Sequence, residues 1–593
     1  MTEQATFRLL DNVDVAMRDG VVLKTDLWLP AADGAWPVLL QRTPYRKEAP
    51  FGSQYISALE FQTALRRGYA IAIQDTRGRY QSDGEFVPFE FEGRDSADTI
   101  EWLRRQPFCN GKVGMFGASY VGATQVLALS ENPEGLKAIA PQLTTARHRE
   151  TWMYRGGALE LAFLLLWVIE ALGADHIFHR MAVMPPDARE RAQAFLELFQ
   201  RDPFAAFTRL PILNEAITEL APYVRDWFDP QAIGGSSESA RPDWIDTNKT
   251  AMLVVAGWND IFLEGSIELF ERAKSRWVGQ NGMPDRLIIG PWSHGNPSDW
   301  QGEEWLGYGA SSVDLPEENL AFFDSVLEDR RPASPVVRYF RSGSNSWHAA
   351  PDWPLPDAVA VPHFLDCSRG TLGSTAGAKA SATYVSDPSM PVPSVGGATF
   401  LPGLLLGRNS GPLDQASIEI REDVLVFTGQ PLRDDLEVTG LVTACLWVTS
   451  SATTCDWTAK LCDVAPDDRS LAIVDGIIRW NRGRETGDDP AELTIRLGHT
   501  SRLFKKGHRL RLQIASSNFP RFDRNPQSAV PSTLARASDF VAAKQQVFSG
   551  AAYPSRLVLP VITGAFPKAR SLAGLSTIDG LQAQDADAGA EFR

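Results

Sequence analysis

The chain of 593 residues is too long for a single hydrophobic core, so we expect two or three domains. A formal net charge of -15, without any run of lysines and arginines, argues against a nucleic-acid partner. The 5 cysteines are scattered and show no C-x-x-C spacing, which argues against a disulfide framework or a zinc site and favours a reducing, cytoplasmic setting. The polar start Met1–Gln4 shows no secretory signal. The most apolar run, Leu161–Ile169, is too short to span a bilayer, so we expect a buried helix there and no membrane partner.

Buried strands and amphipathic helices alternate through residues 1–146. The chain opens with an antiparallel hairpin over Val13–Pro30, turned at Arg18-Asp19-Gly20. The segments that follow are, in order, a strand Pro37–Leu40, a helix Ile56–Arg67, a strand Tyr69–Ile73, a helix Ser96–Arg105, a strand Val113–Phe116 and a strand Leu136–Ala140. Strands separated by helices predict a parallel sheet with helices on both faces.

Residues 147–244 interrupt this alternation. They are mostly helical, and the best periodic runs are Ala158–Gly173, Asp187–Phe199 and Ile212–Leu220. The sheet then resumes over residues 245–335, with strands Met252–Ala256 and Leu287–Gly290 and a closing helix Glu317–Leu327. We therefore interpret residues 147–244 as a helical cap inserted into the α/β domain.

The last part of the chain has a different character. From residue 336 to residue 568, short alternating strands separated by turn residues predict a β-sandwich or jelly roll. Residues 569–593 form a polar tail, rich in alanine and glycine, that we expect to be disordered.

The stretch Gly117-Ala118-Ser119-Tyr120-Val121-Gly122 joins a buried strand to an apolar helix. A serine between small residues at such a junction is typical of a nucleophile elbow, a sharp turn that lifts the hydroxyl clear of the sheet edge. The usual pattern is G-x-S-x-G; here Val121 takes the place of the last glycine, and Gly122 follows one residue later. Because glycine and serine are common at strand ends, a serine nucleophile needs support from a base and an acid.

A serine hydroxyl is a weak nucleophile until a histidine removes its proton and a carboxylate orients that histidine. In α/β-hydrolases the chain order is Ser, then Asp or Glu, then His, each in a loop after a strand. All 8 histidines follow Ser119, but only His294 follows a buried parallel-type strand; the alternative is an ordinary surface-loop histidine. Asp260 follows the strand Met252–Ala256, where it could also cap the helix that starts near Glu264. Ser119, Asp260 and His294 form the predicted catalytic triad.

Several motifs follow one another along the chain: Arg42-Thr43-Pro44-Tyr45, Asp75-Thr76-Arg77-Gly78, the stretch around Ser119, Gly257-Trp258-Asn259-Asp260, Gly290-Pro291-Trp292-Ser293-His294, Gly411-Pro412-Leu413-Asp414-Gln415, Ser517-Asn518-Phe519-Pro520 and Phe522-Asp523-Arg524-Asn525. Together they resemble the X-Pro dipeptidyl-peptidase/cocaine esterase family, in family order to about Val561. The resemblance implies an α/β-hydrolase domain with an inserted helical cap and a C-terminal β jelly roll. It also implies an oxyanion hole made by the backbone N–H of Tyr120 and by Tyr45, which the loop after the strand Pro37–Leu40 supplies.

The family includes esterases of aromatic acids, α-amino acid ester hydrolases, cephalosporin acylases and proline-specific dipeptidyl peptidases. The α-amino acid enzymes hold the substrate ammonium with carboxylates where this chain has Phe262, Leu263 and, roughly, Met153, so the resemblance disfavours substrates with a free α-amino group. Trp152, Trp167 and Phe262 match residues that wall the acyl pocket of cocaine esterase-like members, and Gln54 corresponds to a polar contact with the leaving group. The alternative is that these aromatic residues are simply the core of the cap.

The resulting hypothesis is a serine esterase that acts on a small-molecule ester of an aromatic or bulky hydrophobic acyl group, with no metal or organic cofactor. An amidase, acylase or X-Pro dipeptidyl-peptidase activity on an amide is the alternative among enzymes. The alternative from another class is a sugar-binding module with an inert α/β domain, suggested by Trp353 and Trp457, which we expect to be exposed. The sequence leaves the oligomeric state open, a homo-oligomer included.

Overall fold

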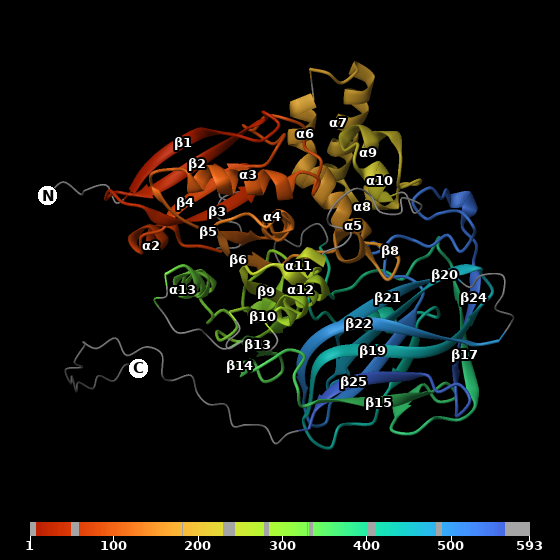
Figure 1. Cartoon of the computed structure of the whole chain (residues 1–593). Helices are drawn as coiled ribbons and strands as arrows, with labels where there is room; N and C mark the ends of the chain where they lie inside the picture. The colour runs from red at the N-terminus through yellow and green to blue at the C-terminus, as the bar shows by residue number, and fades with distance from the viewer. Residues whose placement is uncertain are drawn as a thin grey trace, which may run out of the picture.

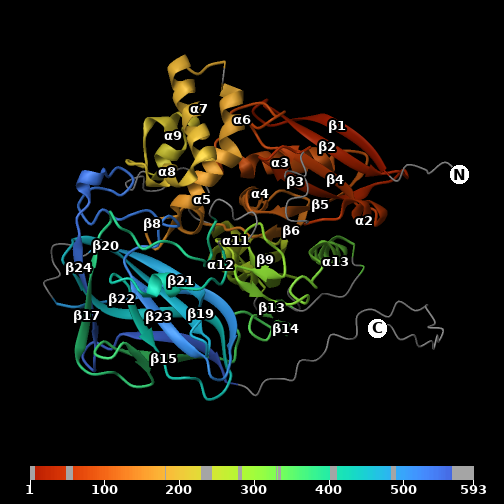
Figure 2. The ribbon, with the colours of Figure 1, turned by 180° about the vertical axis from the view of Figure 1, so that it is seen from behind.

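A computed structural model describes residues 7–48, 58–180, 182–228, 243–277, 284–328, 330, 336–400, 410–481 and 489–563. The predicted tail over residues 569–593 lies outside these ranges, as does Gln54. Figure 1 shows an α/β layer at the start of the chain, a group of helices above it, and a β domain built from the last third of the chain. The view from behind in Figure 2 shows the β domain lying against both the helices and the α/β layer.

The α/β layer is built on one twisted sheet. Its strand order is β1 (Phe7–Ala16), β2 (Val22–Pro30), β4 (Ala70–Asp75), β3 (Trp36–Thr43), β5 (Cys109–Ala118), β6 (Leu136–Gln142), β9 (Ala251–Asn259), β10 (Arg286–Ser293), β13 (Val337–Arg341) and β14 (Ser346–Ala350). Neighbours from β4 to β13 are parallel, whereas β1, β2 and β14 pair antiparallel at the two edges. The predicted α/β class and its opening hairpin are confirmed.

Helices cover both faces of this sheet. The helices α3 (Glu92–Arg104), α4 (Tyr120–Ala128) and α12 (Leu263–Ser275) pack on one face, and α2 (Phe61–Arg66) and α13 (Leu315–Leu327) pack on the other. Because successive strand residues point to opposite faces, Met115 of β5 lies in the first core and its neighbour Phe116 in the second. This burial on both faces explains why the strands read as continuous apolar runs in the sequence.

The cap contains α5 (Leu161–Leu165), the π-helix η4 (Leu166–Leu172), α6 (Gly173–Arg180), α7 (Pro186–Arg201), α8 (Pro203–Thr208), α9 (Glu215–Leu220) and α10 (Val224–Phe228). The helix predicted over 158–173 begins at Leu161, because β8 (Ala158–Leu159) pairs with β7 (Tyr154–Arg155), and its helical run continues to Arg180. The run Leu161–Arg180 is long and apolar enough to cross a membrane, but 67% of its most apolar part is buried in the protein. We therefore assign it to the core of the cap.

The C-terminal domain is a β jelly roll. Its strands are β15 (Ala358–Asp366), β16 (Thr371–Gly373), β17 (Ala380–Ser386), β18 (Leu425–Thr428), β19 (Leu436–Ser450), β20 (Thr454–Val464), β21 (Ser470–Asn481), β22 (Ala491–Phe504), β23 (Arg509–Ala515), β24 (Ala543–Ser549) and β25 (Arg556–Ile562). The structure differs from the sequence analysis at the boundary placed at residue 336, because β13 and β14 lie beyond it and extend the hydrolase sheet. Short alternating strands do not reveal which of two sheets they join.

Trp353 and Trp457, which we expected to be exposed, are fully buried. Trp457 lies in the jelly-roll core, and Trp353 packs against Trp258 with ring centroids 5.8 Å apart. An indole has a large apolar surface, so its burial in a core is favourable. The alternation of residues along a strand does not by itself show which face is exposed to solvent. The prediction of exposed sugar-binding aromatics is therefore wrong.

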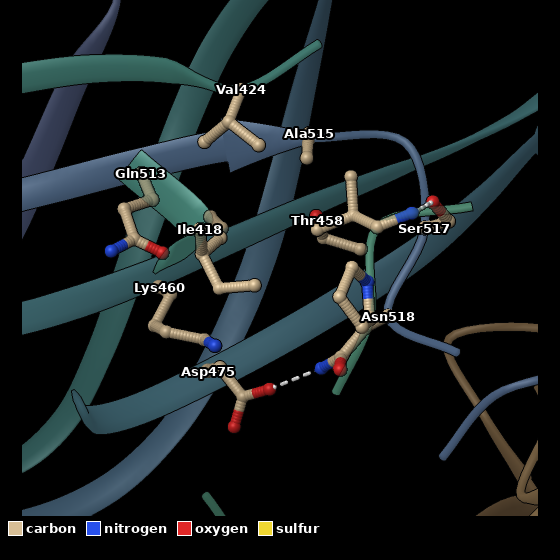
Figure 3. Close-up of a pocket in the computed structure, with 12 residues that line it drawn as sticks. Ile418, Val424, Thr458, Lys460, Asp475, Gln513, Ala515, Ser517 and Asn518 are labelled. Carbon is tan, nitrogen blue, oxygen red and sulfur yellow. Dashed lines mark hydrogen bonds between the residues drawn. The ribbon is translucent and has the colours of Figure 1, made fainter. Parts of the chain in front are cut away.

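A buried polar network fastens the jelly roll to the cap. Asp475 accepts a hydrogen bond from the Asn518 side chain at 2.7 Å beside a small cavity (Figure 3). Asp475 also pairs with Arg521 at 2.8 Å, and Arg521 lies 3.6 Å from Glu160 at the start of α5. Nearby, the Asp523 carboxylate accepts the backbone N–H of Leu159 at 2.9 Å. The last two motifs noted in the sequence, which contain Asn518 and Asp523, therefore help to hold the jelly roll against the cap.

Candidate active site

The predicted site residues lie just after the carboxyl ends of four strands of the sheet. Tyr45 follows β3, Ser119 follows β5, Asp260 follows β9 and His294 follows β10. These strands run parallel, so their carboxyl ends share an edge, where α/β proteins bind their ligands. The cap lies over this edge (Figure 1).

Ser119 occupies the sharp turn between β5 and α4. Its φ of 60° and ψ of -127° are strained for a residue with a side chain, as a nucleophile elbow requires. The flanking glycines are explained by close contacts: a Cβ at Gly117 would lie 2.3 Å from Val121, and one at Gly122 would lie 2.9 Å from Thr144. The elbow tolerates Val121 because Gly122, rather than residue 121, makes the close approach to the chain after β6.

Ser119, His294 and Asp260 form a hydrogen-bonded chain. The Nε2 atom of His294 lies 3.1 Å from the Ser119 Oγ, and its Nδ1 lies 2.6 Å from the Asp260 Oδ2. The second oxygen of Asp260 accepts the backbone N–H of Phe262 at 2.7 Å, which fixes the carboxylate just before α12. All three residues are buried. With Nδ1 protonated toward Asp260, the Nε2 of His294 can accept the serine proton.

None of the other histidines is placed to act as the base for Ser119. All 8 lie in the described ranges, and among them only His294 is hydrogen-bonded to Ser119. His148 is stacked on Phe89 with ring centroids 3.9 Å apart, and burial lowers its pKa to about 3. Within the described residues, no cluster of 3 or more His, Cys, Asp or Glu side chains has metal-binding geometry. The 5 cysteines, all described, are free thiols.

Two groups near Ser119 can donate to an oxyanion. Tyr120 is the first residue of α4, so its backbone N–H has no acceptor within the helix. The phenol of Tyr45 interacts with the Ser119 side chain and accepts a hydrogen bond from the Trp167 indole at 2.9 Å. Burial raises the pKa of Tyr45 well above its usual range, and the hydrogen bonds of Trp167 and Ser119 offset this only in part. The phenol therefore stays protonated and keeps a proton to donate.

Replacing Tyr45 by phenylalanine is expected to lower kcat for ester hydrolysis by about 10²- to 10³-fold, because one donor to the developing oxyanion is lost. The KM should change little, since this donor acts mainly in the transition state. Steady-state kinetics on p-nitrophenyl benzoate measure both. The control is Tyr69→Phe, which removes another buried hydroxyl, one that donates to Asp324 at 2.9 Å, and should leave kcat unchanged. Equal activity of the two variants would exclude Tyr45 from the oxyanion hole.

The loop of Tyr45 is also held by a buried acid. Asp75, at the end of β4, accepts the backbone N–H of Lys47 at 2.8 Å. Burial raises the pKa of Asp75 from 3.8 to about 7, against the opposing hydrogen bond and charge of Lys47. The folded protein therefore holds this proton more tightly than the unfolded chain does, and the stability that it contributes is lost as the pH rises from about 4 to about 7.

We expect Asp75→Asn to remove this contribution, so that the Tm of the variant falls less than the Tm of the wild type between pH 4 and pH 7. Thermal unfolding followed by circular dichroism at several pH values measures the difference. Parallel Tm profiles for the two proteins would show that Asp75 does not titrate in this range.

The structure brings Trp152, Trp167 and Phe262 together beside the triad. The Trp152 and Phe262 rings stack at 4.2 Å, and Trp167 lies 5.2 Å from Trp152. The Phe262 ring meets the His294 imidazole edge-on at 5.2 Å. All three are buried and belong to the core that joins the cap to the elbow. They are therefore both cap core and the wall beside the reacting groups.

Two further rings complete this aromatic wall and were not foreseen. Phe163, one helical turn before Trp167, stacks parallel to it at 6.1 Å, a relation that i,i+4 spacing could have indicated. Phe400, from a loop of the C-terminal domain, lies 5.2 Å from the His294 ring and 6.0 Å from Phe163. No local pattern predicts this second contact, because it joins segments more than a hundred residues apart.

Known proteins are similar to this chain over almost its whole length. The sequence profile of the X-Pro dipeptidyl-peptidase (S15 family) matches residues 19–296, and that of the X-Pro dipeptidyl-peptidase C-terminal non-catalytic domain matches residues 332–558. The cocaine esterase of Rhodococcus sp. (strain MB1 Bresler) is 38% identical over 584 residues, which cover 94% of this chain and 99% of that protein. The chain belongs to the S15 family.

Solved structures of similar proteins cover almost the whole chain. An aminopeptidase from a marine sediment Thaumarchaeota archaeon is 26% identical, with a TM-score of 0.78, over 95% of this chain and 97% of that one. An α-amino acid ester hydrolase shares the fold at 24% identity, with a TM-score of 0.75, over 94% of this chain and 97% of that one. As an S15 family member related to serine esterases, the chain is a serine hydrolase of small-molecule esters or amides.

Proposed function

We propose that the protein is an esterase that cleaves esters of an aromatic or bulky hydrophobic acyl group through an acyl-enzyme on Ser119. The observation that carries this proposal is the hydrogen-bonded chain of Ser119, His294 and Asp260 set against the aromatic wall of Trp152, Trp167, Phe262, Phe163 and Phe400.

The reaction follows from the placement of these groups. His294 accepts the Ser119 proton through Nε2 as the oxygen attacks the acyl carbonyl, while Asp260 holds the imidazole and stabilises its charged form. The tetrahedral oxyanion receives hydrogen bonds from the Tyr45 phenol and the Tyr120 N–H. His294 then gives its proton to the leaving alcohol, and water activated by the same histidine releases the acid and restores Ser119.

The acyl side of the site supports an uncharged substrate. Phe262, Leu263 and Met153 are buried apolar residues. Of the acidic residues nearest to them along the chain, Glu150 is exposed to solvent, Asp260 bonds to His294 at 2.6 Å, and Glu264 bonds to His499 at 3.0 Å. A substrate ammonium would therefore lose its water without gaining a carboxylate, which is costly. An aryl group instead gains ring contacts with the tryptophans.

A matched pair of substrates tests this specificity. We expect kcat/KM to be at least about tenfold higher for the p-nitrophenyl ester of phenylacetic acid than for that of phenylglycine, which differs by one α-ammonium group. A preference for the amino ester would contradict the proposal. The control is the pH dependence of the ratio, which should fall toward one as the pH approaches the pKa of the substrate amine.

An amidase or X-Pro dipeptidyl-peptidase activity is the second candidate, because the similar archaeal structure is an aminopeptidase. Amide cleavage demands firm protonation of a poor leaving nitrogen, so the ester and the anilide of benzoic acid separate the two activities. We expect turnover of the ester and little turnover of the anilide; comparable rates would favour the amidase.

A further inference from the structure

The phenol of Tyr45 depends on two elements from different parts of the molecule. Its backbone lies in the loop after β3, whereas its oxygen accepts the indole N–H of Trp167, which belongs to η4 in the cap. The direction of the Tyr45 hydroxyl is therefore fixed only if this loop and this helix keep a constant relative position.

Arg79 connects the loop and the helix directly. Its side chain is fully buried, its Nε donates to the carbonyl of Pro44 at 2.9 Å, and its Nη1 donates to the carbonyl of Leu172 at 3.0 Å. Pro44 immediately precedes Tyr45, and Leu172 is the last residue of η4. The contacts thus form a closed ring from Tyr45 through Trp167, along η4 to Leu172, and back through Arg79 to Pro44.

Other side chains fix the guanidinium itself. Asp175 of α6 pairs with it at 3.2 Å, and the rings of Tyr80 and Phe86 lie 5.2 and 5.0 Å from its central carbon. A guanidinium is a rigid planar fork, so it can hold two carbonyl oxygens at a fixed separation, which a lysine ammonium on a flexible stem cannot do. Asp175 pairs with the charge of Arg79, although that charge still opposes the burial that raises the pKa of Tyr45. The geometric part of the effect of Arg79 comes from its two bonds to backbone carbonyls.

We propose that Arg79 is a positioning residue for the oxyanion hole. It holds the loop of Tyr45 and the helix of Trp167 in one fixed arrangement, so that the phenol donates toward the carbonyl attacked by Ser119. This inference rests on the proposed esterase activity. The catalytic triad assigns no function to the segment that follows Asp75-Thr76-Arg77-Gly78. The proposed role of Arg79 assigns one to it.

Steady-state kinetics of Arg79→Met and Arg79→Lys on p-nitrophenyl benzoate test this role. Active sites are counted by titration with a fluorophosphonate, so that misfolded protein does not enter kcat. A displacement of the phenol by about 1 Å should lower the kcat of Arg79→Met by up to about 10²-fold. The KM should stay within about threefold, because the lost interaction acts in the transition state. Arg79→Lys should recover part of the kcat, since an ammonium can still bond to one carbonyl.

A double variant distinguishes positioning from general stability. In a Tyr45→Phe background the phenol is already absent, so Arg79→Met should lower kcat by less than about threefold further. The matched control is Arg276→Met, which removes a fully buried arginine paired with Asp285 at 2.9 Å before β10, at the sheet edge opposite the site. That variant should lose thermal stability but keep the wild-type kcat per active site.

Each outcome decides the proposal. A wild-type kcat per active site in Arg79→Met, or a loss that multiplies fully with that of Tyr45→Phe, would overturn it. If Arg79→Met does not fold, Arg79→Lys and Asp175→Asn carry the same test, with a smaller expected loss of kcat. A wild-type protein that hydrolyses no ester would instead refute the proposed function, and this is seen before any variant is made.

Discussion

Replacement of Ser119 by alanine is expected to lower kcat for p-nitrophenyl benzoate by at least about three orders of magnitude, and by up to about six if the triad acts as one unit. The hydroxyl oxygen is the atom that would form the acyl-enzyme, and no neighbouring side chain can replace it at the elbow. The remaining activity would come from the oxyanion hole and from binding alone.

The control for this variant is Ser266→Ala. Ser266 lies on α12, is also buried, and takes no part in the hydrogen bonds of the triad. Its hydroxyl donates to the backbone carbonyl of Thr144 at 2.7 Å. Its removal should lower the Tm with little effect on kcat. If Ser119→Ala retained activity within tenfold of the wild type while folding normally, Ser119 would not be the nucleophile.

The second large effect is expected for Asp260→Asn, which should lower kcat by about four orders of magnitude while preserving the fold. The structure supplies a specific reason. One Asp260 oxygen accepts the N–H of Phe262 at 2.7 Å, and the asparagine carbonyl oxygen should keep that bond. The amide NH₂ then faces the Nδ1 of His294 and forces the proton onto Nε2. In that tautomer His294 cannot accept the proton of Ser119.

Asp285→Asn is the matched control, because Asp285 is also a fully buried carboxylate and pairs with Arg276 at 2.9 Å at the opposite sheet edge. Its loss should destabilise the protein and leave kcat per active site unchanged. Crystallography of Asp260→Asn would show whether the amide orientation is the one expected. A kcat within tenfold of the wild type would mean that His294 needs no carboxylate to act.

The sequence alone was sufficient to place the triad because each member follows its own buried strand. Parallel strands leave their carboxyl ends at one edge, so the order of Ser119, Asp260 and His294 carries three-dimensional information. The glycines of the motif can also be explained locally. A Cβ at Gly117, for example, would lie 2.3 Å from Val121.

The sequence could not show contacts made between domains. The ring of Phe400 reaches His294 from the C-terminal domain, and Arg79 joins the loop of Tyr45 to the cap through backbone carbonyls, which leave no trace in residue identity. The burial of Trp353 was missed for a different reason: its partners Trp258 and Tyr339 belong to the core of the hydrolase sheet, whereas the sequence analysis assigned Trp353 to the β domain.

The most direct test of the account is intact-mass and peptide mass spectrometry after treatment with a fluorophosphonate. This reagent phosphonylates a serine only where a base activates it and an oxyanion hole receives the phosphoryl oxygen. We expect one phosphonyl group per chain, located on Ser119 and absent from Ser119→Ala. An unmodified wild-type protein, or a phosphonyl group on a different serine, would contradict the account.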